Sequence, residues 1–274
     1  MAELNRPHDA GNASDTNDVN DAGNVNDAGT ARDADPGNNA GHADDPHRLR
    51  ERRRTRIKLC GMTRAADVDL AVQLGADAIG LVFYEKSPRA VSVAQAAALT
   101  RRLPPFVAAV GLFVNADEAS VCRAAEAGQL SLLQFHGDET PEACARLAGA
   151  ARLPWIRALR IGSATSAADL LKYPSLYVAA RGLVLDALVD GYGGGGHPFD
   201  WSCIPKELGY QAVLGGGLDA RNVADAVRRV RPYAVDVSSG IEATGSAQVK
   251  GVKDAARMAA FVQAVREADR DDGT

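Results

Sequence analysis

Short apolar runs alternate with longer segments in which apolar residues recur at helical spacing, and this rhythm holds from about residue 56 to the end of the chain. Several runs are apolar almost throughout, which is typical of parallel strands buried on both faces. The segments between them are rich in Ala, Leu, Arg and Glu, which favour helices. The pattern predicts eight strands, over residues 56–60, 78–83, 107–114, 130–135, 155–161, 183–187, 212–214 and 234–237.

Helices are predicted between these strands and after the last one. Thr63 is expected to cap the first helix and Gly75 to end it, and Pro141 suits the first turn of a helix capped by Thr140. Eight βα units within about 215 residues indicate an α/β fold, the closed (β/α)8 or TIM barrel. An open doubly wound sheet is the alternative, which the lack of a long interruption disfavours. The predicted helices cover residues 64–74, 93–103, 116–127, 141–148, 222–230 and 253–268.

Composition separates the first 50 residues from the rest. The whole chain is 46% hydrophobic and 5% aromatic, which suits a layered α/β core better than an all-β sandwich. Residues 1–45 hold ten acidic residues against two arginines and include an imperfect repeat of Asn, Asp, Ala and Gly. Such a segment has almost nothing to bury that would offset the entropy lost on ordering. We therefore expect a disordered extension over residues 1–50 and one barrel domain over residues 51–270.

Charge and cysteine usage limit the expected partners. Six arginines between residues 48 and 56 could contact nucleic acid or anionic lipid, but a short run without aromatics favours a solvated linker. The four cysteines form no CxxC pair, so neither a zinc site nor a disulfide framework is indicated. No apolar run approaches the roughly 20 residues that span a bilayer, and the N-terminus lacks a signal-peptide plan. The sequence predicts a cytoplasmic protein with no metal, no nucleic-acid partner and no membrane association.

Small and ionisable residues follow the ends of all eight predicted strands, and in a barrel these ends meet at one rim that carries the active site. Glycines after strands 7 and 8 let backbone amides approach an anion, so the sequence predicts a phosphate site there. Residues 191–196, rich in glycine, suggest a mobile lid whose far end is anchored by Phe199 and Trp201. The rim residues are Cys60, Arg89, Asn115, His136, Arg160, Asp186, Gly215–Gly217, Asp236 and Ser238–Gly240.

Seven ordered motifs resemble those of the N-(5′-phosphoribosyl)anthranilate isomerases, and the resemblance covers essentially all of residues 56–268. It implies an intramolecular oxidoreductase, an aldose–ketose type isomerase of L-tryptophan biosynthesis. Such enzymes convert N-(5-phosphoribosyl)anthranilate to 1-(2-carboxyphenylamino)-1-deoxyribulose 5-phosphate by an Amadori rearrangement, without a cofactor or an obligate protein partner. The motifs are KLCGMT, GADAIGLVFYEKSPR, QFHGDE, LVLDA, GYGGGGHPFDW, LGGGL and RPYAVDVSSGIE.

The resemblance also implies roles for individual residues. Cys60 would be the general base, Asp186 the general acid, and Arg89 the partner of the anthranilate carboxylate. The phosphate would lie against two turns, at Gly216 and Gly217 and at Ser239 and Gly240, while His136 and Asp236 would line the pocket. His197 and Pro198 depart from the Lys or Gln followed by Thr that is usual in the family, which bears on lid closure rather than on reaction type.

The two catalytic groups need opposite environments. A thiol acts as a base only after it has lost its proton, whereas an acid must keep one. Negative charge on the substrate helps Asp186 to hold its proton but hinders ionisation of Cys60, so a nearby cation must offset it. Lys58, two residues earlier on the same face of the strand, is a candidate for that cation.

Other functions remain open at this level. Indole-glycerol-phosphate synthase and the sugar isomerase of histidine biosynthesis are also phosphate-binding barrels. The first is expected to use lysine and glutamate at strand ends, and the second an Asp where this chain has Cys60. A catalytically silent barrel recruited as a scaffold is a further alternative, against which the presence of both Cys60 and Asp186 argues.

Overall fold

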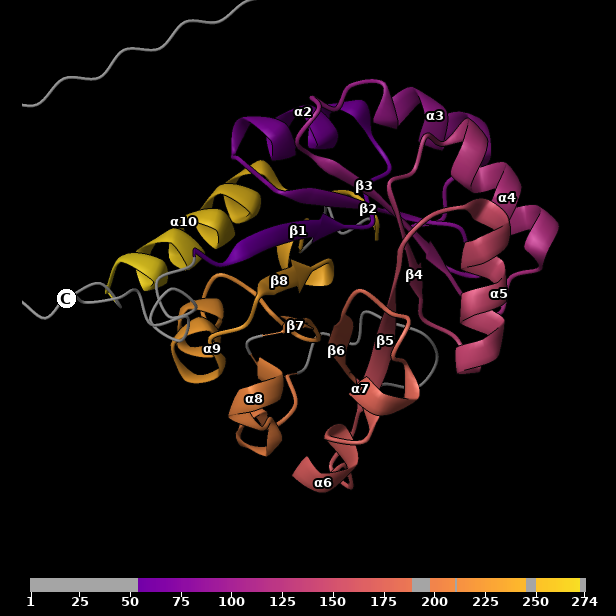
Figure 1. The fold of residues 1–274 in the computed structure, drawn as a ribbon. Coiled ribbons are helices and arrows are strands. Elements are labelled where there is room, and N and C mark those ends of the chain that lie inside the picture. The colour runs from indigo at the N-terminus through magenta and orange to yellow at the C-terminus, as the bar shows by residue number, and fades with distance from the viewer. Residues whose placement is uncertain (1–53, 189–197, 210, 245–249, 272–274) are drawn as a thin grey trace, which may run out of the picture. The chain divides into compact units, whose positions relative to one another are not determined.

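Eight parallel strands close into a barrel in sequence order in the computed structural model (Figure 1). The structure describes residues 54–188, 198–209, 211–244 and 250–271. Closure is direct, because β1 pairs with both β2 and β8, and the predicted TIM barrel is confirmed. The strands are β1 (Arg56–Cys60), β2 (Ala78–Val82), β3 (Ala108–Phe113), β4 (Leu132–Phe135), β5 (Trp155–Ile161), β6 (Leu183–Ala187), β7 (Ala212–Leu214) and β8 (Ala234–Val237).

Helices follow the strands and cover the outside of the barrel (Figure 1). All six predicted helices are present with shifted ends, and three short ones were not predicted. The short helices have four residues each, too few to show a helical period. In order the helices are α2 (Ala65–Gln73), α3 (Val93–Thr100), α4 (Glu118–Ala127), α5 (Pro141–Ala151), α6 (Ala167–Leu170), α7 (Tyr173–Leu176), α8 (Lys206–Gly209), α9 (Val223–Val230) and α10 (Ala255–Asp271).

Helix ends show where local rules hold and where tertiary contacts override them. Thr140 caps α5 by accepting a hydrogen bond from the Ala143 amide, with Pro141 in the first turn as predicted. The predicted cap at Thr63 is wrong. Arg64 occupies the cap position of α2 without a side-chain bond, and the Thr63 hydroxyl instead donates to the Gly251 carbonyl oxygen at 2.7 Å.

One strand begins later than its apolar pattern predicts. Residues 130 and 131 precede β4 because the chain is still closing the end of α4, where Gln129 has a left-handed φ of 47°. The Leu130 amide donates to the Ala125 carbonyl oxygen, and the Leu130 side chain is buried in the core around the barrel. Leu130 is thus buried as part of the turn that ends α4 and not as part of β4.

Three clusters of buried apolar residues hold the barrel together, the smallest of them formed by Cys60, Val82, Leu112 and Val114. The largest lies between the strands and the surrounding helices and includes Phe113, Phe135 and Phe261, all almost fully buried. A smaller core fills part of the barrel interior, with Ile156, Val184 and their neighbours. Phe199 and Trp201 are partly buried against the largest cluster, as predicted for anchors.

Two predictions fall outside the described residues, namely the disordered extension over residues 1–50 and the lid over residues 191–196. Among the residues that are described, no helix is long and apolar enough to cross a membrane. The cytoplasmic location stays a prediction.

The start of the barrel is bound to its last helix. Asp269 on α10 accepts hydrogen bonds from the Thr55 amide at 3.0 Å and from the Thr55 hydroxyl at 2.7 Å. Arg266, one turn earlier, donates to the Thr55 carbonyl oxygen at 3.2 Å. The first residue before β1 is therefore fixed by a carboxylate more than 200 positions away in sequence, which assists closure between β1 and β8.

Replacement of this carboxylate should loosen the closure. We expect Asp269→Ala to lower the free energy of unfolding by about 2 kcal/mol, because two hydrogen bonds to a charged, largely buried group are lost. Urea denaturation followed by circular dichroism measures the change. Asp271→Ala is the matched control, since it removes an exposed ion pair with Arg228 and should cost about 0.5 kcal/mol or less. Equal losses in both variants would contradict the role given to Asp269.

Candidate active site

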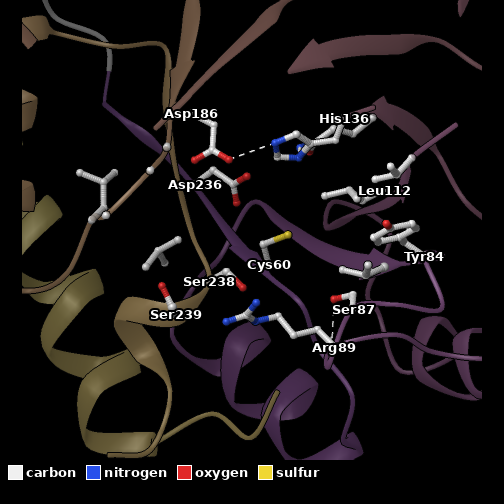
Figure 2. Close-up of a pocket in the computed structure, with 18 residues that line it drawn as sticks. Cys60, Tyr84, Ser87, Arg89, Leu112, His136, Asp186, Asp236, Ser238 and Ser239 are labelled. Atoms are coloured by element: carbon white, nitrogen blue, oxygen red, sulfur yellow. Dashed lines mark hydrogen bonds and ion pairs between the residues drawn. The ribbon is translucent and has the colours of Figure 1, made fainter. Parts of the chain in front are cut away.

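A pocket opens at the C-terminal ends of the strands, and every strand except β5 contributes to its walls, directly or through the loop that follows it (Figure 2). Of the nine residues given a role in the site, only Gly240 does not line this pocket. Among the other predicted rim residues, Gly215 and Ser238 line it, whereas Asn115 and Arg160 do not. Lining residues to which the sequence assigned no role include Tyr84, Ser87, Leu112 and Gln134. The residues given a role that line it are Cys60, Arg89, His136, Asp186, Gly216, Gly217, Asp236 and Ser239.

Cys60 is the last residue of β1 and is 5% exposed. It pairs in register with Gly80 of β2, where a Cβ atom would lie 2.5 Å from the Cys60 sulfur. A glycine on the neighbouring strand therefore makes room for the thiol. Burial raises the pKa of Cys60, the positive charge of Lys58 counteracts this shift, and the charge of Asp236 adds to it. The pKa remains above its ordinary value in the absence of substrate.

Asp186 and His136 meet across the pocket mouth (Figure 2). His136 Nε2 lies 3.0 Å from Asp186 Oδ2, and both side chains are largely buried. The contact is a close approach rather than an aligned hydrogen bond, and Nε2 has no other hydrogen-bond partner among the described residues. The other carboxylate oxygen, Oδ1, accepts a bond from the Ala187 amide at 3.0 Å, which fixes the carboxyl group at the end of β6.

Arg89 is held by a buried partner that the sequence did not reveal. Its Nε and one Nη atom donate to the two carboxylate oxygens of Glu242 at 2.6 and 2.9 Å. Lys253 donates to the same carboxylate at 3.1 Å and to the Ser238 carbonyl oxygen at 3.0 Å. Burial alone would raise the pKa of Glu242, but its bonds to Arg89 and the charge of Lys253 lower it below the ordinary value. With Lys253 protonated, the triad carries one net positive charge, although burial lowers the pKa of Lys253 below its ordinary value.

Only part of the information needed to find this triad is present in the sequence. Glu242 ends the SSGIE motif, and Lys253 lies 11 residues later, just before α10. Both are far in sequence from Arg89. Nothing in their local pattern separates them from surface charges. Only burial identifies them, because the Lys253 side chain is 0% exposed and that of Glu242 is 8% exposed.

The glycine turns after β7 and β8 leave room only for backbone. Gly216 has a left-handed φ of 75°, and a Cβ there would overlap the Ala187 nitrogen. Gly217 also has a left-handed φ, of 68°. Gly240 lies behind the pocket wall, where a Cβ would overlap the Leu218 carbonyl oxygen. Its contribution is thus to let the two turns pack together, beside Ser239 at the start of the 3-10 helix η2 (Ser239–Ile241).

Within the described part of the chain, no group of three His, Cys, Asp or Glu side chains is arranged to hold a metal ion. The pocket itself offers acids, bases and backbone amides. A thiol at the end of β1 and a carboxyl group at the end of β6 lie on different sides of one opening, with anion-compatible turns beside them. That arrangement suits proton transfers on a bound anion.

Comparison with known proteins agrees with this geometry. A family model described as N-(5′-phosphoribosyl)anthranilate (PRA) isomerase matches residues 57–264. The N-(5′-phosphoribosyl)anthranilate isomerase of Ralstonia nicotianae is 59% identical over 225 residues, covering 79% of this chain and 94% of the relative. That of Herminiimonas arsenicoxydans is 56% identical over 220 residues, with 79% and 95% covered.

Solved structures give the same result. The phosphoribosyl anthranilate isomerase of Thermotoga maritima aligns with a TM-score of 0.67 at 37% identity, covering 78% of this chain and 99% of that chain. A phosphoribosyl anthranilate isomerase in complex with reduced 1-(o-carboxyphenylamino)-1-deoxyribulose 5-phosphate aligns with a TM-score of 0.63 at 34% identity, with the same shares covered. By sequence and by fold, this chain belongs to the N-(5′-phosphoribosyl)anthranilate isomerase family.

Proposed function

We propose that this chain catalyses the Amadori rearrangement of N-(5-phosphoribosyl)anthranilate to 1-(2-carboxyphenylamino)-1-deoxyribulose 5-phosphate, a step of L-tryptophan biosynthesis. The observation that carries the proposal is the placement of Cys60 and Asp186 at the ends of β1 and β6, facing one pocket beside two glycine turns. The relative solved with a reduced form of that product supports the same substrate class.

The reaction needs one acid and one base on opposite sides of the sugar. Asp186 delivers a proton to the ring oxygen, which opens the furanose to a Schiff base. The Cys60 thiolate then removes the proton from C2′, and the electron pair of that C–H bond forms the enolamine. Tautomerisation of the enolamine gives the ketone.

His136 supports the acid. Its Nε2 lies 3.0 Å from Asp186 Oδ2, and the Ala187 amide donates to Asp186 Oδ1 at 3.0 Å. The carboxyl group is therefore held on both oxygens at the end of β6, where it faces the pocket.

Binding uses the two charged ends of the substrate. The Arg89–Glu242–Lys253 triad leaves Arg89 with free donors towards the pocket and supplies the positive charge that complements the anthranilate carboxylate. The phosphate lies against the turn at Gly216 and Gly217 and against Ser239, while Gly240, behind Ser239, lets the second turn pack closely on the first. Asp236 lines the pocket below the sugar.

Loss of either proton-transfer group should abolish most of the activity. We expect Cys60→Ala and Asp186→Asn each to lower kcat by about 10²–10⁴-fold, since each removes one of the two general catalysts. The assay is the decay of phosphoribosylanthranilate fluorescence with purified protein, together with rescue of a tryptophan auxotroph that lacks this step. Cys122→Ala on α4, remote from the pocket, is the control and should behave as wild type. Normal rescue by either catalytic variant would exclude the proposed pair.

Removal of the Arg89 guanidinium should weaken substrate binding. We expect Arg89→Met to raise KM about 10- to 100-fold, because a charge-assisted bond to the substrate carboxylate is lost. Steady-state kinetics measures this effect. Arg102→Met removes an arginine from an exposed pair with Asp69 and should leave KM unchanged. An unaltered KM in Arg89→Met would show that the carboxylate binds elsewhere.

The barrel alone should carry the activity. We propose residues 51–270 as the catalytic domain, because every residue assigned a role in binding or proton transfer lies between Lys58 and Lys253, and the contacts that close the barrel extend from Thr55 to Asp269. Deletion of residues 1–50 is expected to leave kcat and KM within about twofold of the full chain, since surface changes away from a site have small effects. A large loss of turnover in the shortened protein would contradict this assignment.

A further inference from the structure

A base role for Cys60, which rests on the proposed function, raises an electrostatic problem. Only a thiolate can accept the C2′ proton, and a thiol in an apolar interior ionises reluctantly. Cys60 is 5% exposed, with Val82, Leu112 and Val114 packed around it. Burial is the largest influence on its pKa and raises it. The substrate then brings two more negative groups into the same pocket. Something in the protein must favour the thiolate.

Lys58 lies directly below this thiol. Residues two positions apart on a strand face the same way, so Lys58 and Cys60 both point into the barrel, with Lys58 one layer deeper. Lys58 is 5% exposed. Its Nζ donates to Asp236 Oδ2 at 2.7 Å, and the two residues are register partners on β1 and β8. Burial alone would lower the pKa of Lys58, but the Asp236 charge raises it above its ordinary value, so the ammonium stays charged.

The other charged side chains near the Cys60 thiol already form ion pairs with each other or oppose its ionisation. Lys253 is bonded to Glu242, which also holds Arg89. Asp236 opposes ionisation of Cys60, and across the pocket Asp186 is paired with His136. Among the cations, Lys58 has the largest effect on the pKa of Cys60, and it lowers it, with a smaller effect in the same direction from Lys253.

A contribution to folding stability alone does not explain the Lys58–Asp236 ion pair. Buried ion pairs contribute little net stability, and apolar residues of similar volume often do as well or better. Moreover, Asp236 uses only one oxygen for Lys58. Its Oδ1 is buried and has no hydrogen-bond partner among the described residues, while the carboxylate lines the substrate pocket. A pair built for stability alone would satisfy both oxygens.

We propose that Lys58 is the positioning residue that makes Cys60 a base: its ammonium group, anchored on Asp236, lies beneath the sulfur and stabilises the thiolate. The thiol proton passes to water when the free enzyme ionises. Lys58 keeps its three protons throughout, and the thiolate later takes up the C2′ proton and becomes a thiol again. Lys58 thus acts through Cys60 and does not touch the reacting atoms.

Alkylation of the free enzyme tests this without any substrate. The rate at which iodoacetamide modifies Cys60, followed by mass spectrometry of the peptide that contains it, reports the thiolate fraction at each pH. Loss of the Lys58 charge should move the midpoint of this profile upward by at least about one pH unit, which slows alkylation about tenfold below the midpoint. Lys58→Met is the variant to measure. Lys58→Arg keeps a positive charge and should stay near wild type.

The decisive comparison uses the partner carboxylate. Asp236→Asn removes a negative charge that disfavours the thiolate, so it should move the midpoint downward, opposite to Lys58→Met. A merely structural pair predicts that both variants loosen the site and shift the profile in the same direction. The same direction in both, or no shift in folded Lys58→Met, would overturn the proposal.

A third variant covers the case in which Lys58→Met does not fold. Lys58→Met combined with Asp236→Asn leaves no unpaired buried charge, and its midpoint should lie above that of Asp236→Asn, because only the Lys58 charge differs between the two proteins. Circular dichroism and thermal melting establish that each protein is folded. A folded double variant whose midpoint coincides with that of Asp236→Asn, or lies below it, would contradict the role of Lys58.

Activity then separates this inference from the proposed function. The acid limb of the kcat/KM profile rises as Cys60 ionises, so in Lys58→Met it should move upward together with the alkylation midpoint. If the alkylation midpoint moves and the acid limb does not, Lys58 controls the thiol but Cys60 is not the base. In that case the proposed mechanism fails while the Lys58–Cys60 interaction stands.

Discussion

The two-residue repeat of the barrel strands is the constraint on which the site depends. Alternate residues of every strand face the interior, so Lys58 and Cys60 are stacked on β1 and cannot be separated. Closure between β1 and β8 then places Asp236 beside Lys58 in register. The positions of the proposed base, of its proposed cation and of the counter-ion of that cation follow from strand geometry, before any loop adds a group. A shift of one residue in the β1–β8 register would break the arrangement.

Charge in the pocket is arranged in small groups, each with a definite net value. The charges of Lys58 and Asp236 cancel, although the two groups are placed differently with respect to the Cys60 sulfur. Arg89, Glu242 and Lys253 sum to one positive charge, next to the predicted binding position of the carboxylate. Without Lys253 the Arg89–Glu242 pair would be neutral and would complement an anion poorly. Glu242 in turn fixes the planar guanidinium in one orientation, which lowers the entropy lost when the substrate binds.

Much of this could be read from the sequence, since strand ends and the residues that follow them obey local rules. The bounds of β1, β5, β6, β7 and β8 are as predicted, and residues at or just after the ends of all of these except β5 line the pocket. Two of the failures have a common cause in contacts distant in sequence. Thr63 does not cap α2 because the Gly251 carbonyl oxygen takes its hydroxyl, and Glu242 was missed because its partner is 153 residues away. The local sequence pattern gives no information about pairings between residues so far apart in the chain.

Glycine shows how strongly the site depends on neighbouring strands. Gly80 has no side chain and supplies no reactive group, yet any side chain at its position would occupy the space of the Cys60 sulfur. Gly216 packs against the end of β6 where Asp186 stands, and Gly240 packs against the turn that follows β7. The Cys60 thiol, the Asp186 carboxyl group and the glycine turns are therefore each positioned by a missing Cβ on an adjacent element. Side chains on the strands supply the proposed chemistry, but their spacing is set by these backbone contacts.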